Sequence, residues 1–193
     1  MGKSMLGIET KKEESEAQEY IVKLKGWKTE HGAFIRPESE ESCIIRSDRY
    51  YTRKHMWAQK TSDGNFKVGI TDYAQKFIKE NASLIQIFKN PIVGDEVNAG
   101  EAFGVIYGGI YANMPARCYE YRAFELTAPV NGKIIKINPQ VMSKPKLVNE
   151  SPYDEGWIAI IAPANQPDIS ELITPEKYRE ILQGNEKSPF KIV

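Results

Sequence analysis

The chain has 193 residues with 26 basic and 26 acidic side chains, so its formal net charge is zero. A balanced charge argues against a nucleic-acid binder that depends on bulk attraction to phosphates. Apolar residues make up 41% of the chain, enough for a globular protein to bury a real core. No stretch approaches the roughly 20 apolar residues that span a bilayer, and the N-terminus lacks the apolar block of a signal peptide. We therefore expect a cytoplasmic protein that binds neither nucleic acid nor membrane.

Residues that commonly hold metals or act as general bases are scarce. The only cysteines are Cys43 and Cys118, and the only histidines are His31 and His55. They form no CxxC pair and no Cys/His cluster of the spacing that zinc requires. The sequence thus argues against a zinc enzyme or a hydrolase triad, and we expect no metal site.

Residues 1–46 are predicted to form an N-terminal extension. A charged leader comes first, and at 20–25 large apolar residues alternate with basic ones before Gly26, which is typical of a half-buried strand. Two shorter apolar stretches at 33–35 and 43–45 predict further short strands. Such an extension can hold a small sheet element, but it is too short for a core of its own.

From residue 50 onward the strand signals become regular. Asp72, followed three residues later by Gln75, resembles a capping box that opens a short helix. Thr174 with proline and glutamate after it predicts the start of a second helix, which Gly184 would end. Strands are predicted at 65–70, 84–88, 103–107, 123–128, 133–137 and 157–161. Many short strands with turns between them predict a mostly β protein, a small β-sandwich or barrel with flanking short helices, and residues 185–193 would form a C-terminal tail.

Several sequence blocks stand in a fixed order within this part of the chain. They are Y-T-R-K-H-M-W at 51–57, V-G-I-T-D-Y-A-Q at 68–75, G-D-E-V at 94–97 with G-E-A-F at 100–103, A-P-V-N-G at 128–132, and L-V-N-E-S-P-Y-D-E-G-W at 147–157. In this order they resemble the H protein of the glycine cleavage system. The resemblance implies that residues 47–184 form a hybrid barrel of the lipoyl/biotinyl type. It also implies a lysine at the tip of a hairpin, carrying lipoate on a flexible arm that takes an aminomethyl group from glycine decarboxylase and visits the next enzymes.

The chain departs from the family at the hairpin that would carry this lysine. The family's motif is close to E-S-V-K-A, whereas no lysine occurs here between Lys89 and Lys133. Aligned from the preceding strand, the family's lysine falls near Ile110, and aligned from the following turn it falls near Tyr121. The hairpin is also about ten residues longer, a length that often signals function or disorder. Because lipoylation forms an amide on a lysine amine, we expect no cofactor, and lipoate only if the alignment of this hairpin is wrong.

The enlarged hairpin contains the candidate site. Its members are Tyr111, Met114, Arg117, Cys118, Tyr119 and Tyr121, with Tyr107 just before them. Tyrosine and arginine dominate binding hot spots, so these residues could form a recognition surface for a protein. Alternatively, they could pack the enlarged hairpin onto the barrel.

Three further features have two readings each. The Cys118 thiol could accept an acyl or sulfur group if Arg117 or Arg122 lowered its pKa, or Cys118 could be an ordinary partly buried cysteine. His55 could tie down a turn or act as a base. The pair Gly108-Gly109 does not belong to a glycine-rich pattern that starts a helix, as a phosphate-binding loop does. It predicts a tight or bulged bend.

These observations leave three functions open. The first is a non-lipoylated binding or scaffold module that presents the hairpin to a protein partner, with the glycine cleavage enzymes and other lipoate-linked enzymes as candidates. The second is a lipoyl carrier of the glycine cleavage system. The third is a thiol carrier that uses Cys118. None of the three has a catalytic residue, and none makes the chain an enzyme by itself.

Overall fold

A computed structural model describes residues 17–23, 27–28, 34–35, 42–78, 81–88, 93–111 and 119–184; for residues 27–28, 34–35, 109–111 and 119–121 it describes the backbone. The strands are β1 (Glu19–Lys23), β2 (Trp27–Lys28), β3 (Phe34–Ile35), β4 (Ser42–Arg46), β5 (Tyr50–Tyr51), β6 (Met56–Lys60), β7 (Phe66–Ile70), β8 (Ala82–Ile87), β9 (Glu96–Val97), β10 (Ala102–Tyr111), β11 (Tyr119–Thr127), β12 (Gly132–Ile137) and β13 (Ala159–Pro163). The helices are α1 (Asp72–Phe77), α2 (Pro139–Ser143), α3 (Leu147–Glu150) and α4 (Pro175–Leu182).

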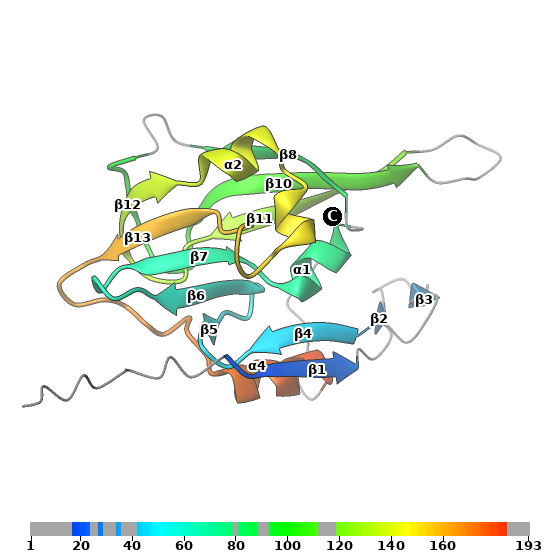
Figure 1. The fold of residues 1–193 in the computed structure, drawn as a ribbon, viewed down its shortest axis with the longest axis horizontal. Coiled ribbons are helices and arrows are strands. Elements are labelled where there is room, and N and C mark those ends of the chain that lie inside the picture. The colour runs from blue at the N-terminus through cyan, green and yellow to red at the C-terminus, as the bar shows by residue number, and fades with distance from the viewer. Residues whose placement is uncertain are drawn as a thin grey trace, which may run out of the picture.

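Two antiparallel sheets enclose the main core (Figure 1). One has the strand order β5-β6-β7-β13-β12-β9 and the other has the order β11-β10-β8. Their inward side chains meet in one buried cluster, to which the larger sheet contributes Val68 and Ile134 and the smaller sheet Ile106 and Phe124. The prediction of a mostly β protein with flanking short helices is confirmed.

The helix termini follow from local capping. Thr71, rather than the predicted Asp72, caps α1, and its Oγ1 accepts a hydrogen bond from the Ala74 N–H at 3.2 Å. Asp72 is the first helical residue, and its Oδ1 accepts from Gln75 Nε2 at 2.7 Å. At α4 the predicted Thr174 cap is confirmed. No helix in the described part of the chain has the length and apolar character needed to cross a membrane.

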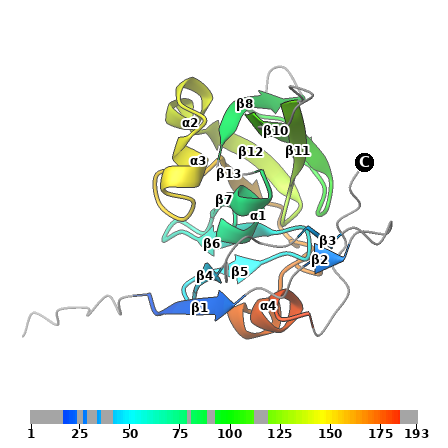
Figure 2. The same cartoon turned by 90° about the vertical axis from the view of Figure 1, so that its right-hand side faces the viewer.

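Strands β1 and β4 form a separate antiparallel pair that packs beside α4 beneath the larger sheet (Figure 2). Val22, Cys43 and Ile45 from this pair are fully buried. They belong to a second buried cluster with Tyr51, Trp57, Tyr73, Tyr153, Tyr178 and Leu182. The pair has no core of its own and is held by the aromatic residues of the following domain. Of the charged leader, predicted at 1–19, residues 1–16 lie outside the described residues, as does the tail at 185–193, and Glu19 already belongs to β1.

Side chains, not a strand, occupy the second edge of β4. The Ile44 N–H donates to Asp72 Oδ2 at 2.7 Å, and Tyr153 Oη donates to the Ile44 carbonyl at 2.6 Å. The Arg46 N–H donates to Tyr51 Oη at 2.7 Å, and that hydroxyl donates back to the Arg46 carbonyl at 2.9 Å. Pairing the backbone of β4 in this way closes one edge of the two-stranded sheet.

Candidate functional site

The candidate site is the hairpin formed by β10 and β11. The two strands pair antiparallel along their whole length, from Ala102 opposite Thr127 to Tyr111 opposite Tyr119. Strand β8 accompanies β10 only as far as Gly108. Beyond that position β10 and β11 pair only with each other among the strands that the structure describes, and in Figure 1 the outer end of this hairpin extends away from the two sheets. Both strands run several residues further toward the tip than the sequence predicted.

The register places the two alignments of the family's lysine on adjacent rungs of the hairpin. Ile110 lies opposite Glu120, and Tyr121 lies opposite Gly109, so the two alignments differ by one rung. Pairing continues outward to the next rung, Tyr111 opposite Tyr119. The additional residues therefore lengthen the hairpin beyond this level. Neither strand contains a lysine.

The base of the hairpin is fixed at the end of α1. Arg122, opposite Gly108, donates from Nη1 to the Phe77 carbonyl at 3.0 Å, and its guanidinium lies 5.2 Å from the centre of the Phe77 ring. A Cβ atom at Gly108 would lie 2.7 Å from the Ile78 carbonyl oxygen, so only glycine permits this approach. The register with β8 shifts between Tyr107 and Gly108, but the extra residue is Ser83 of β8, and β10 pairs with β11 through Gly108 and Gly109 without a shift. The outer part of the hairpin starts from this anchored base.

Sequence reasoning missed the anchoring role of Arg122. It considered this side chain only as a neighbour of Cys118. Arg122 has the same parity along β11 as the buried Phe124, and an arginine at a core-side position needs a partner. That alternation is the signal by which the anchor could have been found.

Alternation along the strands assigns the tyrosines to one face. Ile106 and Phe124, opposite each other, are buried in the core. On the other face, Tyr107 lies opposite the exposed Ala123 and next to Leu84, which is 53% exposed. Because successive strand residues alternate between faces, the positions of Tyr111, Tyr119 and Tyr121 fall on the same face of the hairpin as Tyr107.

The remaining candidates divide between described and undescribed residues. Met114, Arg117 and Cys118 lie outside the described residues. Cys43 is buried in the second cluster, and desolvation raises the pKa of its thiol, so it stays protonated and unreactive. Lys133 lies in β12, opposite Ala162, and not in the hairpin. Within the described ranges, no group of His, Cys, Asp and Glu side chains is placed to hold a metal ion.

His55 lies in the turn between β5 and β6. Its φ of 59° is left-handed, and its N–H donates to the Thr52 carbonyl at 3.0 Å. The buried ring places Nδ1 2.7 Å from Tyr178 Oη on α4. Desolvation lowers the pKa of His55 to about 3, so the ring is neutral at physiological pH. This environment agrees with the reading in which His55 ties down a turn.

Comparisons with known proteins identify the domain around the hairpin. The model of the family described as Glycine cleavage H-protein matches residues 49–185. A glycine cleavage system H protein of Carboxydothermus hydrogenoformans is 37% identical over 141 residues, covering 72% of this chain and 95% of the relative. One of Thermus thermophilus is 36% identical over 140 residues, covering 72% of this chain and 97% of the relative.

A solved structure gives the same result. The crystal structure of a glycine cleavage system H protein from Mycobacterium marinum is similar with a TM-score of 0.55 and 28% sequence identity. The similarity covers 69% of this chain and 95% of that protein. Strands β1 and β4 precede the residues that the family model matches.

Proposed function

This chain belongs to the glycine cleavage H-protein family, and on that premise we propose that it is a family member without lipoate that binds a protein partner through the β10–β11 hairpin. The observation that carries the proposal is the lack of any lysine in the two strands, which include the adjacent rungs where the two alignments place the family's lysine. Without that amine, a lipoyl amide has no attachment point. The chain would then bind without shuttling an aminomethyl group, and we assign it no reaction.

The face of the hairpin supports a binding role. Tyrosine offers a large contact area at a low cost in side-chain entropy and is enriched at the centres of protein interfaces. The tyrosine positions continue the solvent-side face of the smaller sheet, which also carries the exposed Leu84. Packing onto the barrel would instead require them on the face of Ile106. We propose the glycine cleavage enzymes and other lipoate-linked enzymes as partners, because the family's hairpin meets such enzymes.

The absence of lipoate is tested by intact-mass spectrometry of the protein made with a competent lipoyl ligase and free lipoate. We expect the mass of the bare chain. The positive control is a variant whose hairpin is shortened to the family's length and carries E-S-V-K-A at its tip, which should gain the mass of a lipoyl group. A lipoyl adduct on the unaltered chain would refute the proposal and restore the alternative, a working lipoyl carrier of the kind that the names of the relatives describe.

The binding role is tested by removing the hairpin beyond its anchored base. Residues 109–121 are replaced by Asn-Gly, which keeps Gly108 and Arg122 in place. Candidate enzymes are then titrated against the shortened and full-length chains by calorimetry. We expect binding to be lost while the melting temperature stays within a few degrees of the original. Unchanged binding would place the partner surface elsewhere.

The tyrosine face is tested separately, with the hairpin kept at full length. Serine at Tyr111, Tyr119 and Tyr121 should weaken binding strongly, whereas serine at Ile110 and Glu120, positions on the opposite face, should weaken it little. Equal losses from both sets would show that the length of the hairpin, and not its tyrosine face, determines binding.

A further inference from the structure

Strand β1 directs half of its backbone groups away from the protein. The Ser47 N–H donates to the Gln18 carbonyl at 2.9 Å, which identifies their rung as a hydrogen-bonded one. In an antiparallel pair, hydrogen-bonded rungs alternate with non-hydrogen-bonded ones. The even-numbered residues of β1 therefore bond to β4, and the odd-numbered ones, with Ile21 at their centre, direct N–H and C=O outward.

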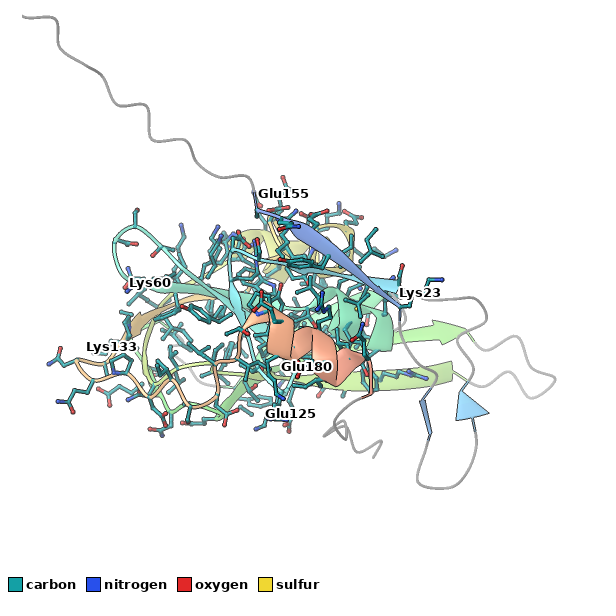
Figure 3. All side chains as sticks on the ribbon, turned by 90° about the horizontal axis from the view of Figure 1, so that it is seen from below. Lys23, Lys60, Glu125, Lys133, Glu155 and Glu180 are labelled. Carbon is teal, nitrogen blue, oxygen red and sulfur yellow. The ribbon has the colours of Figure 1, made fainter. Side chains whose placement is uncertain are left out.

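The two edges of this small sheet differ. The outward groups of β4 are taken by Asp72, Tyr51 and Tyr153, as described above. Beside β1, β4 is the only strand among those that the structure describes. Figure 3 shows β1 near the margin of the molecule, with Lys23 at its end. An edge with outward backbone groups is a template for an additional strand.

The side chains of this edge complement themselves. Ile21 is 76% exposed, and Glu19 and Lys23 lie two residues to either side of it on the same face. If a second β1 approaches antiparallel about a two-fold axis at Ile21, each Glu19 lies opposite Lys23 of the partner subunit. A parallel approach in register would oppose glutamate to glutamate and lysine to lysine, which is unfavourable.

We propose that two copies of this chain pair through β1 about this two-fold axis. The product is a continuous four-stranded antiparallel sheet in the order β4-β1-β1-β4. Its centre is Ile21 against Ile21 of the partner subunit, flanked by Ile44, which lies opposite Ile21 on β4 and is 38% exposed. The contact is isologous and closes at two copies. A five-residue strand buries less than the roughly 800 Å² per partner of a standard interface, so the dimer is weak and depends on concentration.

The experiment is sedimentation velocity of the full chain over a roughly hundredfold range of concentration. We expect a shift from monomer toward dimer as concentration rises. Ile21→Pro should abolish the shift, because proline removes the outward N–H at an edge position where the monomer tolerates it. Its melting temperature should stay near that of the unaltered chain, which shows that the monomer is intact.

A charge exchange tests the register. Glu19→Lys and Lys23→Glu should each weaken the homodimer at least about tenfold, since like charges then face each other. Mixed together, the two variants should form a heterodimer, because every lysine then faces a glutamate. Lys60→Glu, an exposed change on β6, is the matched control and should have no effect.

Three results would overturn the proposal. One is a monomer at every concentration, and another is a dimer that Ile21→Pro leaves unchanged, which would locate the contact elsewhere. The third is a mixture of the two charge variants that associates no more tightly than either alone. Because Glu19 also pairs with Arg46 in the same chain at 2.9 Å, each variant's melting temperature is recorded beside its sedimentation.

Discussion

Removing one hydroxyl group, by Tyr153→Phe, should destabilise the protein by about 2–6 kcal/mol. Tyr153 Oη donates to the Ile44 carbonyl at 2.6 Å and accepts from the Asp72 N–H at 3.2 Å, so it bridges β4 and the first turn of α1. Phenylalanine keeps the ring, which Arg49 approaches to 5.0 Å, and leaves the two backbone groups without this partner. Each buried group left unsatisfied costs about 1–3 kcal/mol, and their sum gives the expected loss.

Urea unfolding followed by tryptophan fluorescence measures the effect as a change in midpoint at constant slope. The matched control is Tyr20→Phe, which removes a hydroxyl that lies 3.4 Å from Gln18 Oε1 in an exposed setting and should cost less than about 0.5 kcal/mol. Equal stabilities of the two variants would refute the reasoning, because β4 would then not be held by Tyr153. A change of slope would instead indicate that β1 and β4 unfold separately from the domain.

Three more predictions concern the histidine and the base of the hairpin. The pKa of His55 is about 3 in the folded state and about 6.5 unfolded, so its contribution to stability is present above pH 6.5 and is lost as pH falls toward 3. Between pH 7 and pH 5 it should cost about 2 kcal/mol, and His55→Asn, whose side chain tolerates the left-handed backbone, should flatten that pH dependence in urea titrations. Gly108→Ala should destabilise by about 1–3 kcal/mol because its Cβ would meet backbone, whereas Ala123→Val, on the exposed face of the same sheet, should change the midpoint little. Arg122→Met should remove the bond to the Phe77 carbonyl, cost about 1.5–3 kcal/mol, and speed hydrogen exchange at the base of the hairpin; exchange rates equal to those of the unaltered chain would contradict the anchor.

Much of the fold was predictable because its signals are local. Alternation of apolar and polar residues located β7, β8, β10, β11, β12 and β13, and the cap and proline at Thr174 located α4, whereas β5, β6 and β9 were not predicted. Helices α2 and α3 have five and four residues, too few for a periodic pattern, and were not predicted. The cap of α1 was placed one residue late, because Asp72 and Thr71 are both good capping residues and only the backbone geometry distinguishes them.

The candidate site was predictable in its location but not in its geometry. The missing lysine is visible in the sequence, yet the two alignments at Ile110 and Tyr121 could not be reconciled without a strand register. Once the register is known, parity assigns every tyrosine of the hairpin to one face. The anchor between Arg122 and Phe77 joins residues far apart in the chain, and no local pattern contains such a contact.

The strand register shows how the lengthened hairpin relates to the missing lysine, because paired residues continue beyond the level at which the lysine is expected. Tyr121 lies opposite Gly109 within the ladder, with at least two further rungs toward the tip. A lysine placed there by Tyr121→Lys would extend from the flank of the hairpin, and the outer rungs would obstruct an enzyme that must reach it. We therefore expect Tyr121→Lys alone to stay unmodified by a lipoyl ligase, while the shortened hairpin with E-S-V-K-A is modified. If Tyr121→Lys is lipoylated as fully as the shortened variant, the hairpin's length does not protect this level. In that case the absence of the lysine alone, and not the greater length of the hairpin, would distinguish this chain from the lipoyl carriers of its family.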